Sequence, residues 1–210
     1  MDEGLVWRPS FGPDPSPPYQ SCEVHPKALT IRQCDRVLDL CRTIEADDAV
    51  LEAGGGQEVG DDGIRQSRIG WIPPSDETWW LFERLVRVAE RANKRYRFDL
   101  TGFAEDLQFT IYEPGAFYTW HQDGLDGRVA HRKLSMVLQL SDPADYEGGE
   151  LQLFDIYEDA DDTQLEEFRT SSVKRGTAIV FPSFEYHRVM PLRQGVRYSL
   201  VAWISGPPFR

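Results

Sequence analysis

Five short segments between residues 107 and 203 alternate apolar and polar side chains, and this pattern constrains the fold more than any other feature. Because successive side chains of a strand point to opposite faces, the alternation predicts strands with one face buried. Turn sequences such as Glu113-Pro-Gly115 and Ser141-Asp-Pro143 separate the segments. The expected strands are Leu107–Tyr112, Leu134–Leu140, Leu151–Phe154, Thr177–Phe181 and Arg197–Trp203.

The first hundred residues follow helical spacing in two places. Thr30 and Gln33 fit a capping box, ahead of an apolar stripe formed by Ile31, Val37, Leu38, Leu40 and Cys41. A second helix is expected from about Ser75 to Tyr96, with Ser75 or Asp76 as its N-cap. Helices followed by many short strands predict an α+β fold, with a double-stranded β-helix (jelly-roll) core and supporting N-terminal helices.

Three segments fall outside this pattern. The proline-rich start predicts that residues 1–20 form an extended arm, ahead of a single domain over residues 21–210 with its core at about 106–207. The glycine-rich segment 53–63 is expected to be a mobile loop, either a lid over substrate or a passive connection. The acidic segment 155–167 is expected to be a solvated loop, with recognition of a basic substrate as the alternative.

Charge and cysteine content narrow the class of protein. A net charge of -12 disfavours binding to nucleic acid or to an anionic membrane. No apolar run approaches the roughly 20 residues of a membrane helix, and Met1-Asp2-Glu3 does not resemble a secretory signal. Cys22, Cys34 and Cys41 show no paired spacing. We expect Cys34 and Cys41 to be small buried side chains of one helix face, in a protein of the reducing cytoplasm.

A candidate iron site lies at His121 and Asp123. Residues two apart on a strand point to the same side, so the imidazole and the carboxylate can converge on one point. With a second histidine they would form a two-His-one-carboxylate triad, which leaves positions open on Fe(II). The other histidines are His25, in an expected loop, His131, in an expected polar turn, and His187, at the start of an expected strand. Strand placement favours His187.

Arg197 and Ser199 lie on one face of the last expected strand. An arginine fork binds a carboxylate through two hydrogen bonds, and a hydroxyl two residues on can add a donor. The pair therefore suits the distal carboxylate of a dicarboxylate whose other end chelates iron. The alternative is a surface arginine on an edge strand, which the apolar neighbours of Arg197 oppose.

These motifs together resemble the 2-oxoglutarate-dependent Fe(II) oxygenases of the prolyl hydroxylase type, over residues 106–207. The resemblance is carried by Tyr112-Glu-Pro-Gly-Ala-Phe-Tyr118-Thr-Trp-His121-Gln-Asp123, Tyr146-Glu-Gly-Gly-Glu150-Leu, Arg175-Gly-Thr-Ala-Ile-Val-Phe-Pro182, His187-Arg-Val, Gly195-Val-Arg197-Tyr-Ser199 and Trp203-Ile.

The resemblance implies a role for each residue and a set of cofactors. His121, Asp123 and His187 would hold Fe(II), while Arg197, Ser199 and Tyr112 would bind 2-oxoglutarate. Tyr118 and Trp203 would line the substrate pocket. O2 would be the second co-substrate, with ascorbate as an optional reductant, and a C–H bond would be hydroxylated with release of succinate and CO2.

Substrate and class keep alternatives at this stage. Collagen-type enzymes usually have lysine at the position of Arg197, so the arginine resembles oxygen-sensing and bacterial relatives instead. A prolyl residue of a peptide or protein is the favoured substrate, and a free amino acid or other small metabolite is the alternative. A non-catalytic cupin-like binding module and a zinc hydrolase are rival classes; the complete ligand set and Arg197 oppose the binding module.

Overall fold

The computed structural model describes residues 19–49, 51–53, 57–59, 63–125, 127–158 and 161–208. All but the last two residues of the expected N-terminal arm lie outside this description. The α-helices are α1 (Ile31–Cys41), α2 (Trp79–Tyr96), α3 (Phe154–Glu158) and α4 (Asp162–Ser172). The strands are β1 (Glu23–His25), β2 (Asp47–Asp48), β3 (Leu51–Ala53), β4 (Gln57–Val59), β5 (Arg65–Gln66), β6 (Arg68–Ile72), β7 (Gly102–Phe103), β8 (Leu107–Tyr112), β9 (Phe117–His121), β10 (Arg132–Gln139), β11 (Tyr146–Gly148), β12 (Leu151–Leu153), β13 (Ala178–Pro182), β14 (His187–Val189), β15 (Leu192–Gly195) and β16 (Arg197–Ser205).

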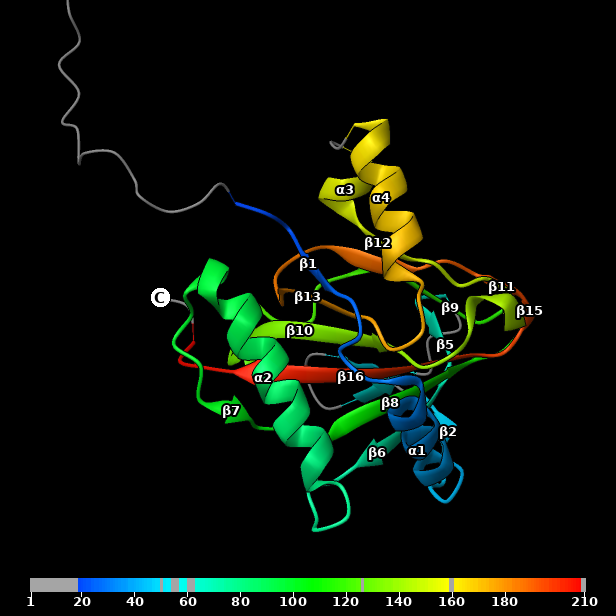
Figure 1. Cartoon of the computed structure of the whole chain (residues 1–210), viewed down its shortest axis with the longest axis horizontal. Helices are drawn as coiled ribbons and strands as arrows, with labels where there is room; N and C mark the ends of the chain where they lie inside the picture. The colour runs from blue at the N-terminus through cyan, green and yellow to red at the C-terminus, as the bar shows by residue number, and fades with distance from the viewer. Residues whose placement is uncertain are drawn as a thin grey trace, which may run out of the picture.

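Two main antiparallel sheets, the two-stranded sheets β11-β15 and β3-β4, and a helical layer make up the described fold, which confirms the α+β prediction. The larger sheet has the strand order β1-β13-β10-β16-β8-β6-β2, with β7 added beside β16. Helices α1 and α2 lie along one face of this sheet (Figure 1). The smaller sheet, β12-β14-β9-β5, packs toward the other face, where Leu153 and Val189 join Ile179 in one apolar cluster. The sheets form a jelly-roll arrangement that is not closed into a barrel.

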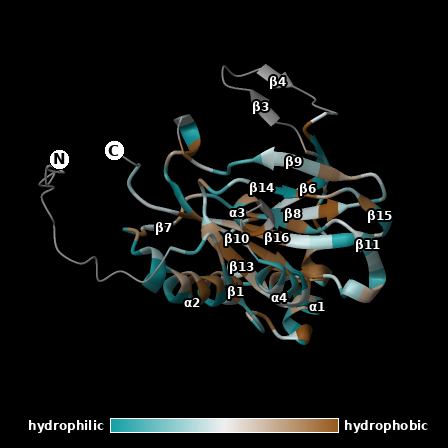
Figure 2. Cartoon of the chain, turned by 90° about the horizontal axis from the view of Figure 1, so that it is seen from above, coloured by the Kyte–Doolittle hydropathy of each residue, from teal (hydrophilic) through white to brown (hydrophobic). Residues whose placement is uncertain are grey.

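Side chains of the three central strands β8, β10 and β16 alternate between a face that packs against the helices and a face toward the smaller sheet. Side chains on one face pack against the apolar sides of α1 and α2, and these are Leu107, Phe109, Leu134, Met136, Leu138, Leu200, Ala202 and Ile204. The intervening side chains point to the opposite face, toward the smaller sheet. Its buried members are unusually polar, and these are Gln108, Thr110, Tyr112, Ser135, Val137, Gln139, Arg197, Ser199 and Trp203. Val201 belongs to the same face and is partly buried. Figure 2 shows the hydrophobic interior between the helices and the central strands.

Both expected helices are present, with differences at their starts. Thr30 and Gln33 form the expected capping box of α1, but Ile31 is 53% exposed, and Cys34 fills the buried stripe instead. Helix α2 begins at Trp79, because Ser75 and Thr78 bond to each other's backbone and hold a turn ahead of it. Such side-chain bonds compete with the helical backbone pattern. The N-cap prediction at Ser75 or Asp76 was therefore wrong.

Three segments expected to be loops form regular structure. Within the acidic segment 155–167 the chain forms α3 and α4, and Asp161 caps α4 through a capping box with Gln164. Acidic residues at a helix N-terminus are stabilised by the helix dipole, which the charge count alone did not show. Strand β4, inside the glycine-rich segment 53–63, pairs antiparallel with β3, which ends at the segment's first residue; residues 54–56 and 60–62 lie outside the description. His25 ends β1. None of the described helices is long and apolar enough to cross a membrane.

Candidate metal centre

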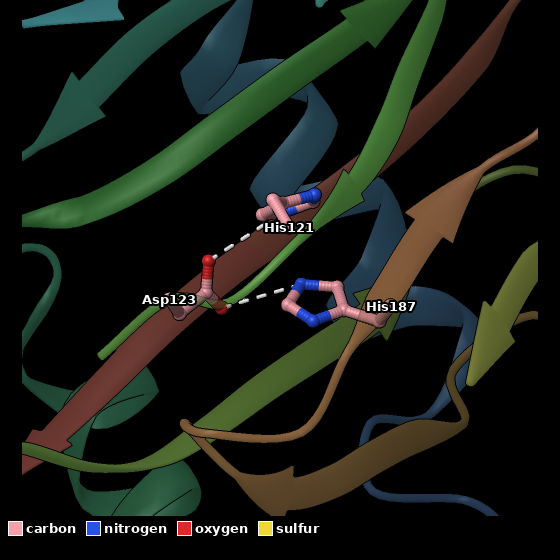
Figure 3. Close-up of side chains that lie close together, drawn as sticks. All are labelled: His121, Asp123 and His187. Atoms are coloured by element: carbon pink, nitrogen blue, oxygen red, sulfur yellow. Dashed lines mark ion pairs between the residues drawn. The ribbon is translucent and has the colours of Figure 1, made fainter. Parts of the chain in front are cut away.

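His121, Asp123 and His187 converge in the smaller sheet, where strand β9 ends and strand β14 begins. His121 ends β9 and His187 begins β14, and the pairing of these strands sets the two histidines opposite each other. Asp123 Oδ1 lies 3.6 Å from His121 Nε2, and Asp123 Oδ2 lies 3.5 Å from His187 Nε2. One ligand atom from each residue lies within 4.8 Å of the others. Figure 3 shows both imidazoles turned toward the carboxylate.

Backbone carbonyls orient both imidazole rings. His121 Nδ1 lies 2.8 Å from Thr119 O, and His187 Nδ1 lies 2.9 Å from Glu185 O. In each ring the Nδ1–H donates to the carbonyl, so the Nε2 lone pair faces Asp123. Histidine ligands of metals commonly donate their other ring nitrogen in this way. The donor set therefore fits a divalent metal.

The carboxylate of Asp123 is held by a residue that sequence reasoning missed. Ser135, on β10, donates its hydroxyl to Asp123 Oδ2 at 2.6 Å. The backbone N–H groups of Asp123 and Gly124 both donate to Ser183 O at 2.9 Å, which fixes the turn after β9. A serine between Leu134 and Met136 was the available signal, because a polar residue in an apolar strand needs a buried partner.

Burial and charge set the protonation of the cluster for metal binding. Burial, with the neighbouring His187, lowers the pKa of His121 to about 3. Burial alone would raise the pKa of Asp123, but the imidazoles of His187 and His121 and the Ser135 hydroxyl bring it down to about 2. At neutral pH the site thus presents the neutral imidazole of His121 and the ionised carboxylate of Asp123, which suits a facial-triad Fe(II) centre with open positions.

Arg197 lies buried at the start of β16, 1% exposed. Its Nη2 donates to Gln139 Oε1 at 3.0 Å, while its Nη1 has no hydrogen-bond partner among the described residues. Tyr112 lies opposite in β8, its ring centroid 5.2 Å from Arg197 Cζ, and Ser199 follows on the same strand face. A buried cation without a carboxylate is costly, so this site fits an anionic ligand. Gln139 was not predicted.

A cavity of about 610 Å³ joins the metal cluster to Arg197. All eight residues singled out from the sequence line it: Tyr112, Tyr118, His121, Asp123, His187, Arg197, Ser199 and Trp203. The ring of Tyr118 stacks on His121 with centroids 3.4 Å apart, and Arg132 Cζ lies 3.8 Å from the Trp203 ring centroid.

The two remaining histidines lie apart from the cluster. His131 lines the cavity wall and pairs with Glu105 at 3.2 Å. His25 Nε2 lies 3.3 Å from a carboxylate oxygen of Glu23, within β1. Of the histidines, only His121 and His187 are brought to Asp123, as strand placement indicated.

A jelly roll that brings two histidines, a carboxylate and a buried arginine into one cavity defines the class of non-haem Fe(II) oxygenases that use a 2-oxo acid. Residues 107–205 match the 2OG-Fe(II) oxygenase superfamily. Together with the fold and the relatives below, this match identifies a 2-oxoglutarate-dependent dioxygenase of the prolyl hydroxylase type.

Individual relatives agree with this assignment. A PKHD-type hydroxylase of Picosynechococcus is 28% identical over 181 residues, which are 86% of this chain and 76% of the relative. A PKHD-type hydroxylase of Cupriavidus metallidurans is 36% identical over 105 residues, 46% of this chain and 41% of the relative.

Solved structures share the fold. A Pseudomonas putida prolyl-4-hydroxylase has a TM-score of 0.64 at 21% identity, over 89% of this chain and 93% of that one. A Trichoplax adhaerens prolyl hydroxylase, solved with a hypoxia-inducible-factor peptide, has a TM-score of 0.65 at 18% identity, over 88% and 83%.

Proposed function

We propose that His121, Asp123 and His187 hold Fe(II), and that Arg197 binds the distal carboxylate of 2-oxoglutarate with help from Ser199 and Tyr112. One observation carries the proposal: a metal-ligand cluster and a buried arginine with an unpaired Nη1 share a single cavity. A dicarboxylate that chelates iron at one end and meets Arg197 at the other answers both requirements.

When bound, Fe(II) would supply the oxidising chemistry together with 2-oxoglutarate and O2. The substrate would be hydroxylated, and 2-oxoglutarate would be converted to succinate and CO2. The protein contributes binding and orientation. Ser135 and the backbone carbonyls fix the ligand geometry, while the stacked Tyr118 and the buried Trp203 form apolar walls that exclude water from the site.

The proposed substrate is a prolyl residue within a peptide or protein. Its support is the names of the relatives and the peptide held by the Trichoplax enzyme. We also propose that residues 21–210 act as one cytoplasmic domain with no nucleic-acid or membrane partner. The three free cysteines and the net charge of -12 support this proposal.

The first test measures succinate formation. We expect it only when Fe(II), 2-oxoglutarate and O2 are all present, and we expect proline-containing peptides to stimulate it more than free amino acids do. Mass spectrometry should find one added oxygen atom on the stimulating peptide. Stimulation by free amino acids alone would replace the peptide substrate with a small metabolite.

Alanine variants test the ligand assignment. His121→Ala, Asp123→Ala and His187→Ala should each abolish turnover while the circular dichroism spectrum stays that of the wild type. His25→Ala is the matched control and should retain activity, because His25 lies outside the cavity. His131 is unsuitable as a control because it lines the cavity wall. Near wild-type activity in any triad variant would remove that residue from the ligand set.

A further inference from the structure

Arg65 is a second arginine beside the metal cluster that neither the metal nor the co-substrate accounts for. It lies on β5, directly opposite Tyr118 of β9, and a hydrogen bond of 2.8 Å from Thr119 N to Ile64 O ties the two segments together. Its Cζ is 4.8 Å from the Tyr118 ring centroid, and that ring stacks on His121. Arg65 is therefore placed one aromatic ring away from a proposed iron ligand.

The hydrogen bonding of Arg65 is incomplete. Its Nε donates to Ser67 Oγ at 2.8 Å. Among the described residues, neither of its Nη atoms has an acceptor, and no carboxylate pairs with it. Arg132, in the same cavity, instead makes two bonds to Glu105. A guanidinium held by Nε and by a ring face still offers its two Nη groups as a fork for a carboxylate.

The charge of the cavity reinforces this point. Among the described residues that line it, the arginines Arg65, Arg132 and Arg197 are set against the carboxylates of Glu105 and Asp123. Glu105 is already bonded to Arg132 and His131, and Asp123 belongs to the metal cluster. The site is thus locally cationic within a chain of net charge -12. Such a field concentrates anionic ligands at the site.

We propose that Arg65 binds a carboxylate of the substrate, next to the group that is hydroxylated. This inference rests on the proposed function and narrows its substrate class to acid-bearing molecules. Arg197, paired with Gln139 beside Tyr112 on the larger sheet, takes the co-substrate; Arg65, on the smaller sheet beside Tyr118, takes the substrate. The carboxylate comes either from an Asp or Glu side chain near the target residue or from a free C-terminus.

A binding selection tests the proposal without requiring turnover. Protein loaded with Mn(II) and 2-oxoglutarate is presented with fully randomised hexapeptides, as one library with free C-termini and one with C-terminal amides. The wild type should enrich acidic residues over their amides at one position by about tenfold, the scale of one charge-assisted hydrogen bond. If peptides of the free-acid library bound better than those of the amide library whatever their side chains, the C-terminal carboxylate would be the source.

Variants separate recognition from packing. Arg65→Gln should lose the acid preference, and Arg65→Lys should keep part of it, because lysine retains the charge without the fork. Arg68→Gln is the matched control: Arg68 is exposed, bonds to Ala46 O and lies outside the cavity, so its variant should select like the wild type. A merely structural Arg65 would lower all binding equally and leave the acid-to-amide ratio unchanged.

The two proposals fail separately in this experiment. Acid enrichment without proline enrichment would support the role of Arg65 and refute the prolyl substrate. Proline enrichment with neither enrichment of acidic residues nor preference for free C-termini would do the reverse. The inference about Arg65 would be overturned by an acid preference of equal size in the wild type and in Arg65→Gln. It would also be overturned if acidic residues were not enriched and the free-acid and amide libraries bound equally well.

Discussion

Replacing Ser135 with alanine should weaken metal binding while leaving every proposed ligand in place. The Ser135 hydroxyl is 2.6 Å from Asp123 Oδ2, and Ser135 itself is fully buried. A hydrogen bond to a charged group contributes about 1.5–3 kcal/mol. Because about 1.4 kcal/mol is a factor of ten in affinity, the expected loss is about 10- to 100-fold, the range for residues that orient metal ligands.

Calorimetric titration of the metal-free protein with Mn(II), in the presence of 2-oxoglutarate, measures this loss directly. Ser205→Ala is the matched control, because Ser205 is also buried in the larger sheet but its hydroxyl has no partner among the described residues. Its Mn(II) affinity should equal that of the wild type. Thermal unfolding of both variants separates a local effect from a global one. Equal Mn(II) affinity in Ser135→Ala and the wild type would refute the reasoning.

Three further predictions concern the co-substrate, acid stability and the core. Arg197→Lys should raise the Kd for 2-oxoglutarate while the Mn(II) affinity changes little, and Arg197→Ala should raise that Kd further; equal affinities by titration would defeat the assignment. Glu105 is half-buried, which alone raises its pKa, but Arg132 and His131 lower that pKa below the ordinary value of 4.5. A carboxyl group whose pKa is lower in the folded than in the unfolded state stabilises the fold at pH values above its unfolded-state pKa. The difference in unfolding free energy between the wild type and Glu105→Gln, measured by urea titration, should therefore shrink as the pH falls through and below about 4.5. Leu85→Ala should cost about 2–5 kcal/mol of unfolding free energy, measured by urea titration, because Leu85 is 1% exposed, whereas Val86→Ala, at a site 38% exposed, should cost under about 1 kcal/mol.

The strands were the most predictable part of the fold. Alternation placed β8 at Leu107–Tyr112 and the start of β16 at Arg197, as the structure has them. Both strands have one face against the helices and one toward the cavity, so their side-chain pattern is strong. The alternation continues through Ile204 and Ser205, which is why β16 runs past its predicted end at Trp203.

The site was predictable in its residues but not in their supports. The His-x-Asp pair, His187 at the start of a strand, and Arg197 with Ser199 on one strand face carry a local pattern, and the resemblance added Tyr112. Ser135 lies on β10 of the larger sheet and Asp123 follows β9 of the smaller sheet, so their contact depends on how the two sheets pack and could not be read from spacing. Nor could the position of Arg65, because β5 has only two residues and no alternation to place it.

The predictions for the start of α2 and for the acidic segment 155–167 were wrong for a different reason. In both cases short side-chain bonds decide the backbone: Ser75 with Thr78 holds a turn ahead of α2, and Asp161 with Gln164 begins α4. Each is one local hydrogen-bond choice among several that the same residues allow. Composition over a window of charged residues does not distinguish them.

The two-faced strands β8, β10 and β16 bear on how this enzyme can change during evolution. A substitution at a cavity-facing position leaves the helix-facing core intact, so substrate preference can drift at little cost in folding. A deletion or insertion of one residue within these strands would instead exchange the two faces, sending Leu200 and Met136 into the cavity and Arg197 into the core. Length variation among homologues should therefore be confined to connections such as the one that carries α3 and α4, while the register of these three strands stays fixed.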